Sequence, residues 1–332
     1  MAPNVLITGS AGHLGTALML SLPSQGLEPL GIDVLASEET TRVGSISDRA
    51  FVSSIFENNP SITRVIHAAT LHKPHVESHP KSAFVETNIQ GTLVLLEEAA
   101  RAGVQSFVFV STTSAFGRAL SPGEGTPAAW IDEDVVPVPK NIYGVTKVAA
   151  EDLCALVHAQ TGMPVVVLRT SRFFPEEDDD EHRRAAMGDE NLKVLELCYR
   201  RADIADVVSA CVCAANRARN IGWGKYVVSA PPPFERDEAV LAALNSDAEG
   251  VIKRVVPACE AVFKEKGWKF LGRIDRVYDS SKAVRELGWD PEYTFGRTIE
   301  RIGRGEEWRS ELTFKVGKRG YHAVSTGVYT VR

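Results

Sequence analysis

Apolar residues follow two alternating patterns along the first 170 positions of the chain. One is a short run rich in Val, Ile and Phe, which has the length and composition of a strand buried on both faces of a parallel sheet. The other repeats apolar positions every three or four residues, as amphipathic helices do. Strands are expected at Asn4–Thr8, Glu28–Ile32, Arg64–His67, Ser106–Val110 and Pro164–Leu168, and helices near His13–Leu22, Asp48–Asn58, Lys81–Ala102 and Asn141–Thr161. This alternation predicts an α/β fold with a doubly wound parallel sheet.

The pattern loosens after about residue 170, so residues 1–170 are expected to form the sheet domain and 171–332 mostly a smaller C-terminal α/β lobe. Ala202–Arg217 and Tyr226–Ser229 are expected to return to the sheet as a helix and a strand. The charged run Glu176–Arg184 is either a solvated loop or helix start, or a lid over a substrate. The tail Thr313–Arg332 packs over the lobe or at an interface. Short helices are expected at Arg236–Ser246, Ser280–Leu287 and Phe295–Gly303.

Composition narrows the classes of partner. The chain has 332 residues, of which 44% are hydrophobic and 24% charged, as in ordinary globular proteins. Its net charge of −6 and the absence of a clustered basic face argue against nucleic-acid binding. The chain contains no apolar run of about 18 residues, so no membrane span is predicted. The N-terminus enters a strand-like run without a signal segment, so a cytoplasmic location is expected.

The five cysteines show no Cys-x-x-Cys spacing. Cys211 and Cys213 are two residues apart on an expected helix and therefore point to different faces. We interpret the cysteines as small buried hydrophobic residues in a reducing compartment, with metal ligation as the minor alternative. His67, His72, His75 and His79 are clustered but lack a metal-ligand spacing, so no metal site is predicted.

A glycine-rich segment, Thr8–Gly15, joins the first expected strand to the first expected helix. Glycines in this position allow a tight turn and a close approach of the backbone to a pyrophosphate, which then lies at the helix N-terminus. The alternative is a turn that only packs helix on strand. The segment predicts a Rossmann-type dinucleotide site made by Gly9, Ala11, Gly12, His13, Leu14 and Gly15.

Asp33 ends the second expected strand, 18 residues after Gly15. A carboxylate there accepts hydrogen bonds from adenosine ribose hydroxyls and repels a 2′-phosphate, so NAD is favoured over NADP. The alternative is a surface aspartate. Asp48, two residues after Ile46, could cap the next helix, reach the adenine amine, or do both. Ile46 and Asp48 are therefore further candidates for the cofactor site.

Tyr143 and Lys147 are four residues apart and would share one face of a helix. An adjacent ammonium favours the phenolate form of a tyrosine, so the phenol becomes a candidate acid/base for an alcohol–ketone conversion. A structural tyrosine beside a solvated lysine would give the same spacing.

Taken in order, these motifs resemble the extended short-chain dehydrogenase/reductase family of nucleotide-sugar epimerases and dehydratases. The resemblance covers residues 4–175 well and 200–300 more weakly. It is carried by the segments Thr8–Gly15, Ile66–Ala69, Asn88–Thr92, Val110–Gly117, Tyr143 with Lys147, Leu168–Thr170, Arg201–Val207 and Asp279–Pro291.

The resemblance implies roles for further residues. Thr112 would hydrogen-bond the reacting oxygen against Tyr143, and Lys147 would also bind the nicotinamide ribose. The other implied cofactor contacts are Ala68, Ala69, Asn88 and Val110, and the substrate candidates are Ser111, Thr113 and Arg172. It further implies a sugar-like substrate and a homodimer through the helices expected at 81–102 and 141–161. On those helices Leu93, Leu96, Val148 and Leu153 are either interface or core.

The chain departs from the family after Leu168-Arg169. Arg172 stands near the position where such enzymes usually carry an asparagine. Only about 30 residues lie between this stretch and Asp206, and this segment is shorter than expected for that family. Three functions therefore stay open. They are a nucleotide-sugar or sugar epimerase or dehydratase, a net NAD(P)-dependent dehydrogenase or reductase of a free sugar, sugar acid or other alcohol, and a cofactor-binding protein without catalysis.

Overall fold

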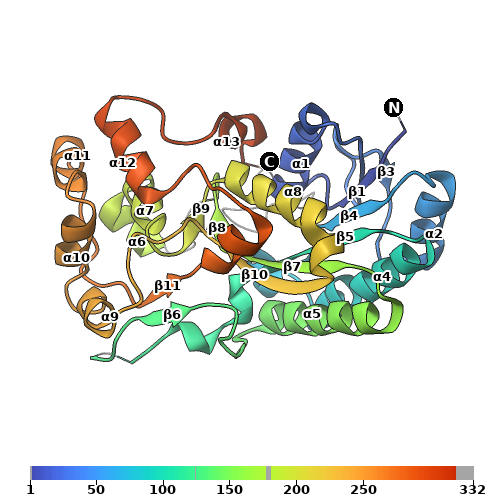
Figure 1. Cartoon of the computed structure of the whole chain (residues 1–332), viewed down its shortest axis with the longest axis horizontal. Helices are drawn as coiled ribbons and strands as arrows, with labels where there is room; N and C mark the ends of the chain where they lie inside the picture. The colour runs from blue at the N-terminus through green and yellow to red at the C-terminus, as the bar shows by residue number, and fades with distance from the viewer. Residues whose placement is uncertain (1, 124, 177–180, 319–332) are drawn as a thin grey trace.

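The computed structural model of the chain describes residues 2–123, 125–176 and 181–318. Its centre is a seven-stranded parallel sheet in the order β10-β7-β5-β4-β1-β2-β3 (Figure 1). The strands are β1 (Val5–Thr8), β2 (Pro29–Asp33), β3 (Arg42–Val43), β4 (Arg64–His67), β5 (Ser106–Thr112), β7 (Val165–Thr170) and β10 (Trp223–Val228). Because all of them are parallel, their carboxyl ends meet at one edge of the sheet. The predicted doubly wound α/β fold is confirmed.

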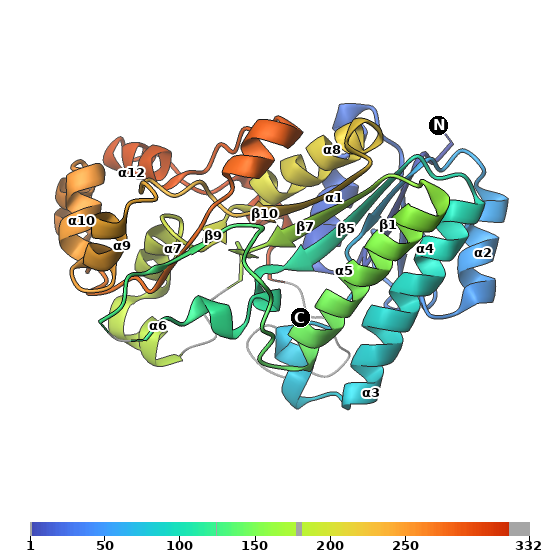
Figure 2. The same cartoon turned by 60° about the horizontal axis from the view of Figure 1, so that its bottom comes forward.

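Helices cover both faces of the sheet, and each face has its own apolar core. Helices α1 (His13–Ser21) and α8 (Ile204–Ile221) pack with the sheet in one core. Helices α2 (Arg49–Asn58), α4 (Gly91–Arg101) and α5 (Ile142–Thr161) pack in the other; α4 and α5 run side by side in Figure 2. The strands are apolar on both faces because both faces are covered.

The end points of α5 follow from two local signals. The Asn141 side chain accepts a hydrogen bond from the Gly144 backbone N–H at 3.0 Å, which caps the first turn. The helix ends at Gly162, which adopts a left-handed φ of 72° that favours glycine. Tyr143 and Lys147 therefore lie in the first two turns of a helix with a fixed start.

The expected single helix at Lys81–Ala102 is interrupted. Helix α3 (Lys81–Phe84) runs into a widened π turn at Val85–Gln90 before α4 begins. Such turns are rare and concentrate at functional sites. Here the turn carries Asn88, whose side chain bonds to the loop after β4.

The smaller lobe is built on its own apolar core at the carboxyl edge of the sheet. It contains two short parallel pairs, β6 (Ala129–Ile131) with β11 (Arg276–Tyr278) and β8 (Arg172–Phe173) with β9 (Arg201–Ala202). Its helices are α6 (Glu181–Met187), α7 (Asp189–Glu196), α9 (Glu238–Leu244), α10 (Ala248–Val255), α11 (Cys259–Lys266) and α12 (Phe295–Gly303).

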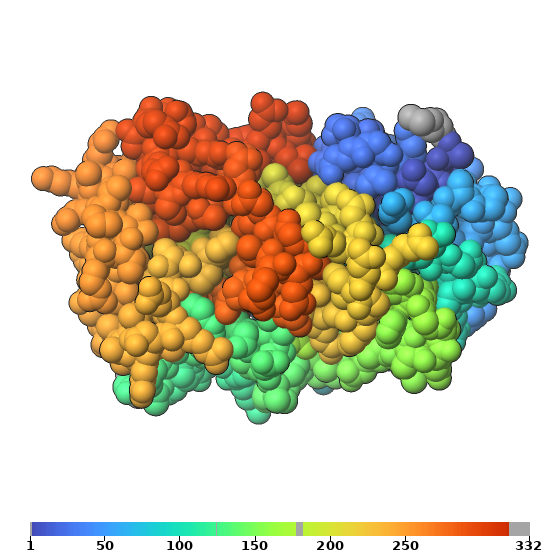
Figure 3. Space-filling model, in the orientation of Figure 1, coloured from blue at the N-terminus to red at the C-terminus, as the bar shows by residue number. Residues whose placement is uncertain are grey.

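The chain crosses between lobe and sheet more than once. Strand β10 pairs with β7, and α8 packs against β5, so segments after residue 200 complete the sheet layer. Helix α13 (Glu311–Val316) then packs against α1 and α8, and the red C-terminal residues lie against the blue N-terminal part in Figure 3. The domain boundary at residue 170 stays a prediction.

Other expectations have mixed outcomes. The helix at Phe295–Gly303 is α12, whereas the one at Ser280–Leu287 is largely a widened turn over Ala283–Leu287. Of the charged run, residues 177–180 lie outside the described part, and α6 begins at Glu181. Residues 319–332 of the tail also lie outside it.

Four of the cysteines are buried and none is in a disulfide, which supports their interpretation as small core residues; Cys213 is only half-buried. Among the residues that the structure describes, no group of three or more His, Cys, Asp or Glu side chains could hold a metal ion. No helix in the described part is long and apolar enough to cross a membrane.

Candidate active site

A cavity of about 1060 Å³ lies at the carboxyl edge of the sheet. Its walls come from the glycine segment, from the ends of β2, β4, β5 and β7, from the start of α5 and from the smaller lobe. Ligands of doubly wound sheets bind at this edge. Of the predicted site residues, those lining the cavity are Gly9, Ala11, Gly12, His13, Leu14, Gly15, Asp33, Ile46, Ala68, Ala69, Val110, Ser111, Thr112, Thr113, Tyr143 and Arg172.

The glycine segment turns tightly against the neighbouring strands. Gly9 has a φ of 76°, and a Cβ there would lie 2.8 Å from the Ala69 backbone nitrogen. A Cβ on Gly15 would lie 1.9 Å from the Gly9 carbonyl oxygen. Gly12 begins α1 without a side-chain cap, so nothing from the cap residue covers the N–H groups of the first turn. This cradle fits a pyrophosphate at a helix N-terminus.

Asp33 and Asp48 have different places. The Asp33 carboxylate accepts hydrogen bonds from the backbone N–H groups of Ala11 at 3.1 Å and Leu35 at 2.9 Å, and it lines the cavity. Burial raises its pKa, against the lowering effect of these bonds. Asp48 instead caps α2 through the Ala50 and Phe51 N–H groups and is not among the lining residues. The structure therefore shows the capping role of Asp48 and does not bring it to the cofactor end.

His67 links the glycine segment to the helices behind it. Its Nδ1 lies 2.7 Å from the Thr8 hydroxyl, and its Nε2 lies 2.9 Å from the Thr92 hydroxyl. Because Thr92 donates its proton to the Asn88 carbonyl oxygen, we assign Nε2–H of His67 as the donor to Thr92. Burial, with a contribution from Lys147, holds the pKa of His67 well below its usual value. The ring is thus a neutral structural link.

Asn88 lies behind the cavity wall. Its amide oxygen accepts from the Leu71 N–H at 2.8 Å, and its amide nitrogen donates to the Leu71 carbonyl at 2.9 Å and to Thr146 at 3.0 Å. The residue is buried and is not among those lining the cavity. The side chain ties the loop after β4 to helix α5, and its expected cofactor contact stays a prediction.

The loop after β4 also carries histidines along the cavity wall. His72 and His75 cap the turn Lys73–Glu77 reciprocally, each side chain accepting the other's backbone N–H. The ring of His72 lies edge-on to that of Tyr143, with centroids 6.5 Å apart. These bonds give the two histidines a structural role in shaping the wall above the tyrosine.

Thr112 and Tyr143 both line the cavity. The Thr112 side chain is close enough to the Tyr143 hydroxyl to lower the pKa of the phenol, and its oxygen accepts from the Ser114 N–H at 3.1 Å. Burial raises the pKa of Tyr143 to about 12; Thr112 opposes this, and the negative charge of Glu176 adds to it. The expected lowering of the phenol pKa is therefore wrong for this structure, because desolvation outweighs every favourable partner.

Lys147 does not line the cavity. Its ammonium donates to the Val110 carbonyl oxygen at 2.7 Å and lies 3.9 Å from the centre of the Phe109 ring. Burial lowers its pKa to about 7, against the raising effects of Glu151 and Cys154. The predicted ribose contact of Lys147 stays a prediction.

A buried ion network behind the cavity was missed at the level of sequence. Glu151, fully buried, accepts two hydrogen bonds from Arg169 at 2.7 and 3.1 Å, one from Ser111 at 2.6 Å and one from Lys225 at 3.1 Å. These partners lower the pKa of Glu151 although burial raises it. The sequence signal that could have identified Glu151 is its position one helical turn after Lys147. Since the Ser111 hydroxyl is engaged here, the network fixes the end of β5.

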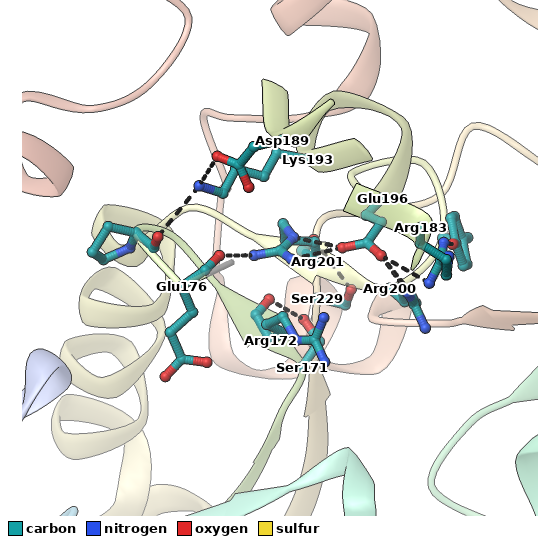
Figure 4. A network of polar contacts seen from close by, with 12 residues as sticks. Ser171, Arg172, Glu176, Arg183, Asp189, Lys193, Glu196, Arg200, Arg201 and Ser229 are labelled. Atoms are coloured by element: carbon teal, nitrogen blue, oxygen red, sulfur yellow. Dashed lines mark hydrogen bonds and ion pairs between the residues drawn. The ribbon is translucent and has the colours of Figure 1, made fainter. Parts of the chain in front are cut away.

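The lobe side of the cavity is rich in arginines. Arg172 from β8, Arg200 from the turn before β9 and Arg276 from β11 all line it. Arg200 pairs with Glu196, which also pairs with Arg183 and with the fully buried Arg201 (Figure 4). One carboxylate thus serves three guanidinium groups. Only Arg172 was predicted, because the three lining arginines are far apart in sequence.

Comparison with known proteins agrees with this geometry. The model of the NAD dependent epimerase/dehydratase family matches residues 5–228. The chain belongs to this family. It is an enzyme of the epimerase/dehydratase type that uses NAD, and the glycine cradle with Asp33 is where the structure fits that cofactor.

Relatives match over most of the chain. The UDP-glucose 4-epimerase of Rhizobium leguminosarum bv. trifolii is 31% identical over 329 residues, covering 89% of this chain and 94% of that protein. The dTDP-glucose 4,6-dehydratase of Streptomyces griseus is 29% identical over 324 residues, covering 88% and 90%. The family thus includes relatives with both reaction outcomes.

Solved structures share the fold. The UDP-glucose 4-epimerase of Thermotoga maritima, solved with UDP-glucose, superposes with a TM-score of 0.61 at 22% identity, covering 91% of this chain and 99% of that one. The Bordetella bronchiseptica enzyme WbmG, solved with NAD, gives 0.60 at 22% identity, covering 92% and 94%.

Proposed function

We propose that this enzyme oxidises a secondary alcohol of a nucleotide sugar to a ketone and then returns the hydride, so that the product is an epimer. The observation that carries the proposal is that Thr112 and Tyr143 line the same cavity as the glycine cradle and three arginines. Thr112 and Tyr143 supply the acid/base function, and the arginines supply a place for an anion.

Each residue has a defined task in this proposal. Thr112 and Tyr143 hold the substrate hydroxyl between their oxygen atoms, and Tyr143 takes its proton and later returns it. Bound at the glycine cradle, NAD would supply the acceptor and donor of the hydride. Glu151 and Arg169 keep the end of β5, and with it Thr112, in place.

The arginines support a substrate with a diphosphate. Guanidinium groups bind phosphate oxygens in a bidentate manner, and three of them line the cavity on the side of the smaller lobe, where Arg200 is also paired with Glu196 and Arg276 with Asp275. The acidic run next to Arg172 does not oppose this at Glu176, because that carboxylate points away from the arginines (Figure 4). A sugar acid could also bind arginine, so a net dehydrogenase of a sugar acid is the second candidate.

One assay separates the candidates. Purified enzyme is incubated with UDP-glucose, UDP-galactose, dTDP-glucose or glucuronate; absorbance at 340 nm is followed and products are separated by chromatography. Epimer formation without accumulated NADH is the expected result. NADH accumulation in proportion to product would establish the net dehydrogenase, and a 4-keto-6-deoxy product would establish a dehydratase.

The role of the arginines is tested by substitution. Arg276→Ala should raise KM for the nucleotide sugar at least about ten-fold and leave NAD affinity unchanged, since a charged hydrogen bond is worth roughly 1.5–3 kcal/mol. Arg254→Ala, on α10, is the matched control. An unchanged KM in the Arg276 variant would remove the diphosphate from the proposal.

The dimer and the other site roles stay proposals. Leu96 is fully buried in the core, whereas Leu93 and Leu153 border a shallow groove between α4 and α5 with the half-exposed Leu156. Val148 is partly exposed on α5. Sedimentation of the wild type and of Leu156→Glu would show whether this groove joins two copies of the chain.

A further inference from the structure

Glu176 is a charged residue of the cavity that the acid/base proposal leaves without a role. It follows β8, and its backbone carbonyl accepts a hydrogen bond from Arg201 Nη1 at 2.7 Å. Arg201 is fully buried and is itself held by Glu196. The backbone of Glu176 is thus anchored, while its side chain points away from the arginines (Figure 4) and lines the cavity.

Two neighbours locate the carboxylate. Its Oε1 lies 3.9 Å from Nδ1 of His13, the first residue of α1. Its negative charge also contributes to the raised pKa of Tyr143. Glu176 therefore lies close to the start of α1 and near enough to Tyr143 for its charge to act on the phenol.

The geometry that hydride transfer requires indicates which half of a bound cofactor would lie next to Glu176. Asp33 and Ile46, the predicted contacts of the adenosine, line the same cavity. The nicotinamide must touch the substrate carbon whose oxygen is held by Thr112 and Tyr143. The space between His13 and Tyr143 therefore receives the nicotinamide half, and Glu176 borders that space.

We propose that Glu176 is the residue that discriminates between the two redox states of the cofactor, because its carboxylate faces the nicotinamide. The oxidised ring carries a positive charge and the reduced ring carries none, so the carboxylate attracts only the oxidised form. This inference rests on the proposed role of Tyr143. Its consequence is that the reduced cofactor becomes a stronger hydride donor, which favours return of the hydride to the ketone over release of NADH.

The redox step balances without another reactant. A hydride, with its two electrons, leaves the substrate carbon for the nicotinamide, and the hydroxyl proton goes to Tyr143. Both return to the ketone in the second half of the cycle. Glu176 changes the relative stability of the two halves and transfers nothing itself.

The pyrophosphate provides an internal control. It carries the same charge in both redox states, so any repulsion between it and Glu176 weakens both forms equally. The ratio of the dissociation constants for NADH and NAD⁺ therefore isolates the charge of the nicotinamide.

The experiment measures this ratio by calorimetry on protein freed of nucleotide. Glu176→Gln should lower the ratio Kd(NADH)/Kd(NAD⁺) about ten-fold, as expected for one charge pair at several ångströms in a partly buried site. Glu176→Asp should keep most of it. Glu77→Gln, which neutralises another carboxylate of the cavity wall, should leave it unchanged.

Equal changes in both affinities, or no change in either, would overturn the proposal. Thermal melting without nucleotide shows whether the variant is folded. Because no substrate is needed, the result is independent of the proposed reaction. Wild-type turnover in Tyr143→Phe would refute the acid/base role on which the placement of the nicotinamide rests, while an unchanged ratio in Glu176→Gln would refute the role of Glu176 alone.

Discussion

The ammonium of Lys147 donates a hydrogen bond at 2.7 Å to the carbonyl oxygen of Val110, which lies on the same strand as Thr112. This bond holds the lysine behind Tyr143 instead of in the cavity. Burial then lowers the pKa of the lysine to about 7 and raises that of the tyrosine to about 12. The four-residue spacing thus brings the two side chains to one helix face, but the burial of each decides its charge.

Tyr143→Phe should lower turnover by about 100-fold or more, the usual contribution of a positioned acid/base. Affinity for NAD should stay within about two-fold, because the ring remains and only the hydroxyl near Thr112 is lost. Turnover is measured on the best substrate from the assay above, and NAD affinity by calorimetry. Tyr293→Phe, a tyrosine that packs against Arg301, is the control. Wild-type turnover in Tyr143→Phe would exclude the proposed acid/base role.

Lys147→Met should remove a pH-dependent part of the stability. Since the folded pKa is about 7 and the unfolded value is 10.5, the folded protein binds fewer protons between these values. The free energy of unfolding of the wild type should therefore rise with pH in this window, by at most about 1.4 kcal/mol per pH unit.

Urea unfolding at pH 7, 8, 9 and 10 measures this slope in the wild type and in Lys147→Met. As pH rises, the free energy of unfolding of the wild type should increase relative to that of Lys147→Met. A difference that is constant with pH would mean that the lysine keeps its ordinary pKa in the fold.

Asp33→Asn should weaken NAD binding by about ten- to a hundred-fold, as expected for hydrogen bonds to a charged group. It should also narrow the preference for NAD over NADP, because the carboxylate no longer repels a 2′-phosphate. Calorimetric titration with both nucleotides gives the ratio. Asp48→Asn keeps a good capping residue outside the cavity and should change neither affinity. An unchanged ratio in Asp33→Asn would make this residue purely structural.

Glu151→Met should cost about 3–5 kcal/mol of stability, because it leaves Arg169 buried without its carboxylate. Replacing both partners with Met removes the two buried charges together and should recover most of the loss. The four proteins of this cycle are compared by their urea midpoints. If the double variant is as unstable as the sum of the single ones, the pair does not interact.

Much of the sheet layer could be predicted from local patterns. Arg64–His67 has the predicted bounds, and the other four predicted strands of the first 170 residues differ from β1, β2, β5 and β7 by one or two residues at one or both ends. Fully buried strands and capped helices leave strong periodic signals, since burial and capping act on neighbours in sequence. The two-residue strands β8 and β9 leave none, because each is defined only by its partner.

The cofactor end of the site could also be predicted from the sequence, whereas the substrate end could not. Gly9, Gly12 and Gly15 lie close together in the sequence, so their spacing alone indicated the cradle. Arg200 and Arg276 reach the cavity only because β9 pairs with β8 and β11 pairs with β6.

The sequence by itself determined the order of strands and helices, the glycine cradle and the shared helix face of Tyr143 and Lys147, because these depend on residues near one another in the chain. Tertiary structure alone decided that Asn88 and Lys147 lie behind the cavity wall, that three arginines and Glu176 face into it, and which way each pKa moves. Those outcomes depend on which distant groups exclude water from a side chain, and desolvation is a property of the packed fold.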